Sequence, residues 1–357
     1  MTTPPVEQER SSWWREISRG ETRFDFVGRR RLWFRVSVTL VAISLLSLVF
    51  RQLNLGIEFE GGLSINGPNP AGATIEELRA ATNQAGVPNA IIQLVDDGQS
   101  VRIQAPAIAE VEEDALLDRV AELTGTQRTE ISVDAVGPSF GALILRRSML
   151  ALAVFLGAVM LYMTWRMEWK MAIAGIVALV HDLILTTGIY SLTGFEVTPA
   201  TVVAILTILG YSLYDTVVVF DKVGEYVHQY GDRMTYSDLV NRSMNLVLAR
   251  SLNTSLVSLL PVGSILFVGA LFLGAATLED FALALFVGIA ASTYSSIFVA
   301  APLLAAWKER EDEWVGRRRK LIGKATRVGP DPGPGGGPAV PAARSGAVPR
   351  PPRKRRR

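Results

Sequence analysis

The chain has 357 residues, of which 49% are hydrophobic and 20% are charged, and its mean hydropathy is +0.28. This composition excludes a largely disordered chain and indicates a membrane protein. The formal net charge is only +2, and the absence of cysteine excludes disulfides and thiol catalysis. The sequence has no P-loop and no catalytic-triad spacing, so any work it performs must draw on something other than nucleotide hydrolysis by the chain itself.

The hydrophobic residues are gathered in long runs, most of which match the roughly 20 residues that cross a hydrocarbon core. A polar head of 31 residues without a small-residue cleavage pattern precedes the first run, which favours an uncleaved anchor helix at 32–51 over a signal peptide. The second run is short, so its boundaries are the least defined. We predict six transmembrane helices, from the runs 32–50, 149–165, 172–193, 198–220, 253–273 and 282–305.

Lysine and arginine are distributed unevenly around these runs. The N-terminal segment 1–31 is rich in arginine, and the links between runs two and three and between runs four and five also carry cations. The links 194–197 and 274–281 carry none. The positive-inside rule therefore predicts that both termini are cytoplasmic and that the segment 52–148 lies outside the membrane.

The segment 52–148 alternates between strand and helix patterns. Thr74 followed by Glu77 is a capping box, which starts a helix that ends near Gly86. Asp96-Asp97-Gly98 is typical of a hairpin turn. The order βαββαβ predicts an α+β ferredoxin-like domain, with strands at 63–66, 90–95, 101–104 and 130–136 and a second helix at 110–123.

The tail 309–357 has a different composition. Its residues 329–352 are dominated by Pro, Gly and Ala, which cannot bury a core, so we expect a disordered cytoplasmic tail. The chain ends in Arg353-Lys354-Arg355-Arg356-Arg357. This basic end is either a solvated tail that enforces topology or a contact for anionic lipid or ribosomal RNA.

Asp215 lies inside the fourth apolar run, in its inner half. A charged side chain near the centre of a membrane helix costs roughly 2.5 to 3.5 kcal/mol on insertion scales, so such a residue usually serves a proton relay, an ion site or a buried pair. Tyr211 and Ser212 precede it by four and three residues and share its helix face, where hydroxyls can carry protons through water. The alternative is an aspartate held by one hydrogen bond that fixes helix packing.

Asp182 is a second carboxylate, at the centre of the third run and next to His181. It extends the proton relay or accepts a hydrogen bond from a neighbouring helix. His181 should point about 100° away from Asp182 on the helix, and a hydrogen-bonded histidine is favoured there. With two histidines in the chain, we expect no metal site and no cofactor.

Arg250 begins the fifth run, and its side chain is long enough to reach toward the depth of Asp215. A guanidinium near a carboxylate favours the charged carboxylate and burial opposes it, so approach and withdrawal of Arg250 would make a proton-coupled switch. The alternative is an interfacial arginine that obeys the positive-inside rule. Asp221 is either a proton exit gate or an interfacial partner of Lys222.

Glycines mark two further positions. Gly56, Gly61 and Gly62 indicate tight turns at the outer end of run one. Gly137, Pro138 and Gly141 are typical of a hinge before run two. Ordinary turns explain both sets equally well.

Together these segments resemble the SecF family of bacterial protein-export subunits, within the wider RND transporter group. The resemblance covers about residues 30–310. Its most specific part is Gly210 to Asp221, which is similar to the family's GYSxNDTVVVFDR stretch, although Tyr214 stands in place of the usual Asn and Lys222 in place of the Arg. The other matching segments are 55–62, where Glu58 replaces the usual Asp, and 136–141, 178–182, 249–255 and 294–298.

The resemblance implies half of a twelve-helix unit completed by SecD in the bacterial cytoplasmic membrane, beside the SecYEG channel. SecA would push the preprotein, and proton flow would drive the outer domains that pull it. YidC and YajC are further candidate partners, the outer domain would hold unfolded preprotein, and no specific nucleic acid is expected. The family's proton-conducting residues fall on Asp215 and Arg250. Two other functions remain open: a structural subunit that stabilises the translocon, or an independent small RND exporter.

Overall fold

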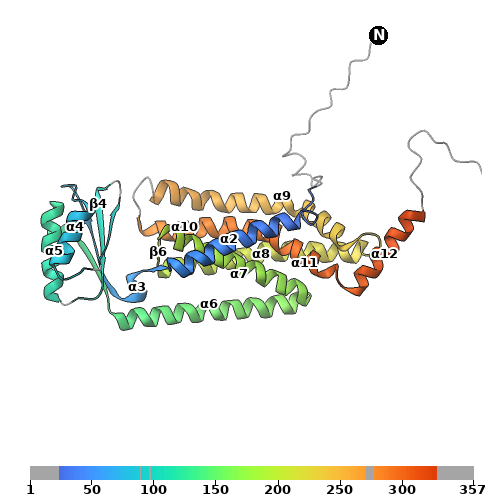
Figure 1. The fold of residues 1–357 in the computed structure, drawn as a ribbon, viewed down its shortest axis with the longest axis horizontal. Coiled ribbons are helices and arrows are strands. Elements are labelled where there is room, and N and C mark those ends of the chain that lie inside the picture. Colours follow the sequence, from blue (N-terminus) through green and yellow to red (C-terminus); the bar gives the residue numbers. More distant parts are fainter. Residues whose placement is uncertain (1–23, 89, 96–97, 109, 271–275, 328–357) are drawn as a thin grey trace, which may run out of the picture.

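The computed structural model describes residues 24–88, 90–95, 98–108, 110–270 and 276–327. A bundle of long helices makes up most of this part of the chain, with a small α+β domain at one end and helix α12 at the other (Figure 1). We refer to these as the domain end and the α12 end of the bundle. Residues 62–136 form the small domain.

Within the described ranges, six helices are long and apolar enough to cross a membrane. Each contains an apolar run with few charged residues that, as a helix, is about as long as a hydrocarbon core is thick. They are α2 (Arg30–Phe50), α6 (Pro138–Arg166), α7 (Trp169–Thr193), α8 (Pro199–Tyr230), the span Tyr236–Gly269 and the span Leu278–Lys308. The fifth span consists of α9 (Tyr236–Gly263) and most of a π-helical stretch, Ser264–Ala270, and the sixth contains α10 (Ala276–Ser295), a π-helical stretch (Ser296–Ala300) and α11 (Ala301–Lys308).

Burial separates the helices into a central group and a peripheral group. In the most apolar stretch of each span, 56% of residues are buried in α7, 50% in the sixth span and 44% in α8. The corresponding shares are 17% for α2 and for the fifth span, and 6% for α6. The interior of the bundle is therefore built by α7, α8 and α10, and large apolar faces of the other helices are left for lipid or a partner.

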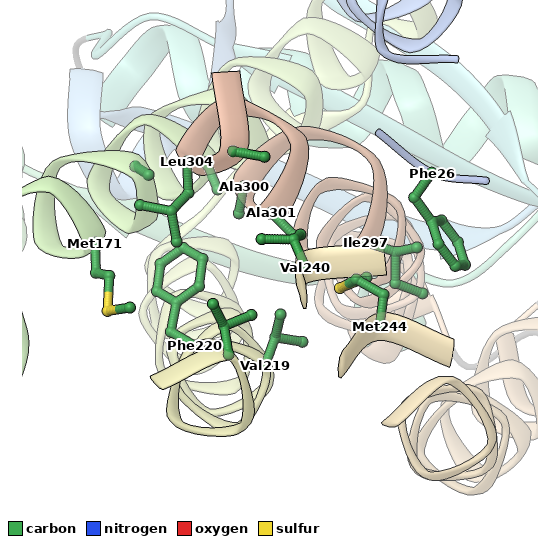
Figure 2. Packing of buried hydrophobic residues seen from close by; sticks show 14 of the residues in the cluster. Phe26, Met171, Val219, Phe220, Val240, Met244, Ile297, Ala300, Ala301 and Leu304 are labelled. Atoms are coloured by element: carbon green, nitrogen blue, oxygen red, sulfur yellow. The ribbon is translucent and has the colours of Figure 1, made fainter. Parts of the chain in front are cut away.

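The bundle interior combines large apolar side chains with glycines. Phe220, Val219 and Met171 pack together with residues of α9 and α11, as Figure 2 shows. At Gly288, an added Cβ would lie 2.2 Å from Cδ1 of Ile208, so α8 and α10 approach as closely as they do because Gly288 has no side chain.

The small domain is a four-stranded antiparallel sheet with two helices. The element order is β2 (Gly62–Pro68), α4 (Ile75–Gln84), β3 (Ile91–Val95), β4 (Ser100–Ala105), α5 (Glu110–Thr124) and β5 (Ser132–Val136), with a 3-10 turn at Arg128–Glu130. The strand order is β3-β4-β2-β5, with Ile65 of β2 opposite Ile103 of β4 and Val133 of β5. Ile65, Ile103, Leu78 and Leu116 are fully buried between sheet and helices.

Most elements predicted for this domain are present. The predicted capping box at Thr74 and Glu77 is confirmed, because the Thr74 side chain accepts from the Glu77 amide and the Glu77 carboxylate accepts from the Thr74 amide. The predicted hairpin turn at 96–98 lies mostly outside the described residues. The observed order βαββαβ matches the predicted order, whereas the ferredoxin-like assignment and the placement outside the membrane stay predictions.

A short junction joins the small domain to the bundle. Strand β1 (Asn54–Leu55) pairs in parallel with β6 (Glu196–Val197), which lies between α7 and α8, and α3 (Ile57–Glu60) follows β1. β1, α3 and β6 were not predicted, since elements of two to four residues carry no periodic signal. This junction places the start of the small domain directly over the loop between α7 and α8.

Two boundaries differ from the prediction. Helix α6 begins at Pro138, well before the apolar run 149–165, because Arg146 and Arg147 interrupt the hydropathy without interrupting the helix. The prediction that the chain is disordered from residue 309 is wrong for Asp312–Arg327, which form helix α12. The Pro-rich and Gly-rich residues 329–352 and the basic C-terminus lie outside the described residues.

Candidate functional site: two buried carboxylates in the helix bundle

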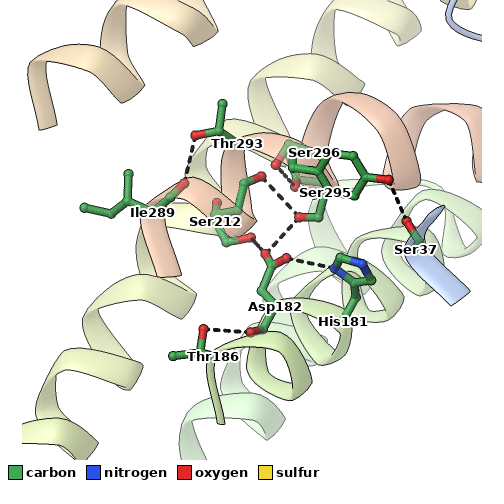
Figure 3. Close-up of polar contacts among 12 residues, drawn as sticks. Ser37, His181, Asp182, Thr186, Ser212, Ile289, Thr293, Ser295 and Ser296 are labelled. Carbon is green, nitrogen blue, oxygen red and sulfur yellow. Dashed lines mark hydrogen bonds and ion pairs between the residues drawn. The ribbon is translucent and has the colours of Figure 1, made fainter. Parts of the chain in front are cut away.

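Asp182 is completely buried at the middle of α7. Its Oδ2 accepts hydrogen bonds from Ser212 Oγ of α8, at 2.6 Å, and from Ser295 Oγ at the end of α10, at 2.9 Å. Figure 3 shows both serines converging on this one oxygen. Hydroxyl donors from two neighbouring helices thus compensate for the loss of water around the acid.

His181 contacts the other oxygen of Asp182, with 3.2 Å between His181 Nδ1 and Asp182 Oδ1. The prediction that the two adjacent side chains point apart is therefore wrong. Their Cα positions do differ by one residue step around the helix, but the side chains turn toward each other in the buried space beside Tyr294, whose ring stacks on the imidazole. His181 Nε2 is buried and has no hydrogen-bond partner among the described residues.

Asp215 lies near the middle of α8, about 24 Å along the helix from its start. Its side chain is 6% exposed, and Ser251 Oγ of α9 lies 2.9 Å from Oδ1 and 2.7 Å from Oδ2. Ser296 also contacts the carboxyl group, and its hydroxyl lies 3.0 Å from Thr216 Oγ1. Hydroxyls from the fifth and sixth spans therefore surround this carboxylate.

Arg250 takes a different place from the one expected. Its Nη2 donates to Tyr214 Oη at 2.8 Å, and the pair is exposed on the side of α8 and α9, where Tyr214 is 51% exposed. Among the described residues, no ion pair joins Arg250 to Asp215. The guanidinium nevertheless lies near enough to act electrostatically on that carboxylate. In this conformation, Ser251 and not Arg250 is the direct partner of the acid.

A series of hydroxyls extends from the Asp215 site toward the domain end of the bundle. Ser255 lies one turn beyond Ser251 on α9. Its Oγ accepts hydrogen bonds from Tyr211 Oη at 3.4 Å and from Thr293 Oγ1 at 2.6 Å. Tyr211 therefore contributes to this series and does not touch Asp215. Ser212 likewise donates its hydrogen bond to Asp182, although it was predicted to lie beside Asp215.

The backbone of the sixth span widens at the site. Ser296–Ala300 form a π-helical turn, directly after Ser295 and directly before α11. Pro302 explains it, because proline has no amide to bond the carbonyl of Phe298 and its ring crowds that carbonyl. The widened turn brings Ser295 toward Asp182 and Ser296 toward Asp215, and π-turns of this kind are frequent at functional sites.

The remaining predicted positions lie outside this network. Asp221 is exposed and lies 3.5 Å from Arg166, whereas Lys222 pairs with Glu225. Of the two alternatives for Asp221, the pair with Lys222 is therefore wrong, and the proton exit gate stays a prediction. A Cβ at Gly210 or Gly137 would meet nothing within 4 Å, so neither glycine is required by close packing.

The other glycines of the predicted set lie at the junction. Gly61 has φ +80° and Gly62 has φ +143°, and each abuts backbone, at Pro138 and Ala105 respectively. Gly141 packs on the backbone of α3, and Pro138 is the first residue of α6, so this segment starts a helix.

Most of the hydroxyl partners were not predicted from the sequence. They are Ser251, Ser255, Thr216, Thr293, Ser295 and Ser296. A usable signal was present, since hydroxyl residues recur within or directly before the otherwise apolar fourth, fifth and sixth runs. No group of three or more metal-ligating side chains occurs in the described ranges.

The fold and the site together define a multi-pass helical membrane protein with two acids buried in its bundle. Residues 117–310 match the family model described as "Protein export membrane protein SecD/SecF, C-terminal". The "Protein translocase subunit SecF" of Streptomyces coelicolor is 41% identical over 310 residues, which are 86% of this chain and 83% of that protein. The chain belongs to the SecD/SecF family of protein export membrane proteins.

Two further comparisons agree with this family assignment. The protein translocase subunit SecF of Mycobacterium tuberculosis H37Rv is 40% identical over 314 residues, 85% of this chain and 71% of that protein. The crystal structure of SecDF from Thermus thermophilus has a TM-score of 0.74 and 35% sequence identity, and the match covers 82% of this chain. It covers 39% of the SecDF chain, so this chain corresponds to less than half of that protein.

Proposed function

We propose that this chain is the SecF-type subunit of a protein-export complex in the bacterial cytoplasmic membrane. In this proposal it pairs with a SecD-type subunit and uses the proton motive force to promote movement of a preprotein through the SecYEG channel, after SecA has acted. The observation that carries the proposal is the pair of buried carboxylates, Asp182 and Asp215, held by hydroxyl groups from neighbouring helices in a chain whose relatives are named translocase subunits.

Hydroxyl partners suit a carboxyl group that gains and loses a proton. A serine hydroxyl donates to a carboxylate and can turn to accept from a protonated carboxyl group. Ser251 lies within 3 Å of both oxygens of Asp215, so either oxygen can carry the proton without rearrangement of the helices. A fixed ion pair would instead hold the acid in its charged form.

The position of Arg250 supports a two-state switch. Its guanidinium is hydrogen-bonded to Tyr214 in this structure, and Asp215 is hydrogen-bonded to Ser251. Movement of Arg250 from Tyr214 toward Asp215 would favour the charged carboxylate, and its return would favour proton uptake. The hydroxyls of Ser255, Tyr211 and Thr293 supply a route by which protons reach the site from the domain end.

The exposed Arg250–Tyr214 pair also indicates a partner. Ionisable side chains in spanning helices almost always face a bundle interior or a water-filled cavity, because lipid cannot solvate them. In the chain alone, this pair faces outward from the middle of the bundle. A second helical unit that covers this pair would place it in the interior of a larger bundle. Because some relatives are SecDF proteins, a SecD-type subunit is the natural candidate for this unit.

The proposed orientation of the chain in the membrane and the energy of the proton gradient are compatible with this function. With the termini in the cytoplasm, the small domain lies outside, where it can hold emerging preprotein. One proton that crosses a potential of 100 mV releases about 2.3 kcal/mol, and repeated cycles of that size can bias a sliding chain.

The test is preprotein release from vesicles that contain the complete translocon, with this chain and its SecD-type partner, in the presence and absence of a proton gradient. Asp215→Asn should abolish the stimulation by the gradient and leave assembly intact. Asp232→Asn is the matched control, because Asp232 is 93% exposed at the α12 end. Stimulation of normal size in Asp215→Asn would refute the coupling role and favour a structural subunit. Export without any SecD-type chain would favour an independent exporter.

A further inference from the structure

A third buried acid lies outside the spanning helices, at the junction of bundle and small domain. Glu196 belongs to β6, between α7 and α8, and is only 7% exposed. Its Oε2 accepts a 2.5 Å hydrogen bond from Gln104 Nε2 of β4. Gln104 is itself 8% exposed. This contact joins a side chain of the small domain directly to the bundle.

A second carboxylate shares the same space. A Cβ added to Gly56 would lie 2.5 Å from Glu58 Oε2 and 2.6 Å from Glu196 Oε1. Since both oxygens lie so close to one point, they are separated by at most about 5 Å, a range in which two carboxylates in a shared site resist simultaneous ionisation. Glu58 Oε2 is buried and has no hydrogen-bond partner in the described part of the chain. Gly56 is required because any side chain would fill the space into which both acids point.

Other charges face this pair from the surrounding elements. Arg102 of β4 carries a positive charge that lies close enough to attract the carboxylate of Glu196. Glu279 and Asp280 of α10 add negative charge near the same site, and the Tyr190 hydroxyl of α7 bonds the backbone carbonyl of Asp280. One arginine thus faces four acidic side chains, so the site carries an excess of negative charge when all of them are ionised.

Burial raises the pKa of Glu196, and the neighbouring charge of Glu58 raises it further, whereas the bonds from Gln104 and the charge of Arg102 oppose the rise. The raised pKa means that the docked arrangement binds a proton more tightly than an arrangement in which Glu196 meets water. Docking is therefore favoured at low pH, and the advantage is lost as pH rises through the raised pKa of Glu196.

Two backbone connections join the small domain to the bundle beside this contact. Its first strand begins at Gly62, which like the preceding Gly61 has a backbone conformation that other residues rarely adopt, and its last strand leads into Gly137. A Cβ at Gly137 would meet nothing within 4 Å, whereas Gly61 abuts the backbone of Pro138 at the start of α6. The Gln104–Glu196 bond adds a side-chain contact between domain and bundle to these backbone connections.

We propose that Glu196, Glu58 and Gln104 form a proton-sensitive latch that holds the small domain against the membrane bundle. When Glu196 carries a proton, it keeps its bond to Gln104 and the domain stays docked. When the proton leaves, two close negative charges separate, Gln104 is released and the domain undocks. The link of this motion to export rests on the proposed function, but the latch itself does not require proton flow through Asp215.

The test measures docking directly in the full-length chain with its SecD-type partner. Because the chain has no cysteine, spin labels can be placed at Ala115→Cys, exposed on α5, and Val203→Cys, exposed on α8. Pulsed-EPR distances are then recorded in detergent over roughly pH 5 to 9. A docked population at low pH should give way to longer distances as pH rises, with the population ratio changing by up to about tenfold per pH unit for one proton.

Variants separate the latch from other titrating groups. Glu196→Gln and Glu58→Gln each remove one charge and should keep the domain docked across the range, whereas Gln104→Ala should undock it even at low pH. Asp215→Asn should titrate like the wild-type chain. The proposal is overturned if the wild-type distances do not change with pH, if Glu196→Gln retains the wild-type titration, or if Asp215→Asn abolishes it.

Discussion

Gly288→Ala should destabilise the bundle more than its small size suggests. Gly288 is buried in α10, and an added methyl group would lie 2.2 Å from Cδ1, 2.6 Å from Cγ1 and 2.7 Å from Cγ2 of Ile208. Ile208 is only 2% exposed and is β-branched, so its side chain cannot turn away without displacing α8 from α10. Ser212 lies one turn beyond Ile208, which links this packing to the Asp182 site.

Two opposing terms set the magnitude. Replacement of glycine by alanine within a helix gains about 1 kcal/mol from helix propensity alone. Overpacking of a close-packed core typically costs about 1–3 kcal/mol, and here three side-chain atoms are closer than real Cβ contacts allow. We therefore expect a net loss of stability for Gly288→Ala. Gly210→Ala, the same substitution in α8 with nothing within 4 Å, should show only the gain.

Thermal unfolding of the purified complex in detergent measures both variants against the wild-type chain. Gly288→Ala should lower the unfolding midpoint, and Gly210→Ala should leave it unchanged or raise it. Adding Ile208→Ala should recover part of the loss, with a coupling free energy of about 0.5–3 kcal/mol in the double-mutant cycle. If Gly288→Ala is as stable as Gly210→Ala, the close packing of α8 on α10 described above is wrong.

Substitutions at three further positions test separate contacts. Ser251→Ala removes the hydroxyl bonded to Asp215 and should lower gradient-stimulated export, whereas Ser251→Thr keeps a hydroxyl and should retain most of it. Arg250→Gln should abolish the stimulation while the complex still co-purifies, and loss of co-purification would instead indicate a role in assembly. Thr74→Ala should weaken α4 by about 1 kcal/mol, measured by faster hydrogen exchange of its first-turn amides. Because bonds from the Thr74 backbone and side chain lower the pKa of Glu77 below 4.5, the protection given by this cap should be complete above pH 4.5 and should fall as pH drops through the lowered pKa.

Hydropathy predicted the spanning helices well, because the number of consecutive apolar residues is a property of the sequence itself. It predicted their ends less well. Helix α8 continues to Tyr230 and α9 begins at Tyr236, so both extend far beyond the apolar runs as polar helices. Hydropathy reports where a helix leaves the hydrocarbon, whereas capping and tertiary contacts decide where the helix ends.

The candidate site was predicted in part. The two buried acids could be found because a carboxylate in an apolar run is conspicuous, but their partners depend on how each helix is rotated against its neighbours. Ser212 shares a helix face with Asp215 in the sequence, yet α8 is oriented so that Ser212 bonds Asp182 of α7. Arg250 was expected to approach Asp215, but Ser251, the next residue, occupies that place. Helix rotation leaves no pattern that a single sequence displays, and Pro302 marks a disturbed turn without showing which side chains that turn brings to the acids.

The central claim is that Asp215 gains and loses a proton during export. The most direct measurement is proton flux into sealed vesicles that contain the full-length chain with its SecD-type partner, driven by an imposed pH difference. The wild-type complex should conduct protons, Asp215→Asn should reduce the flux to that of vesicles without protein, and Asp232→Asn should conduct like the wild-type complex. Equal flux in wild-type and Asp215→Asn vesicles would contradict the claim.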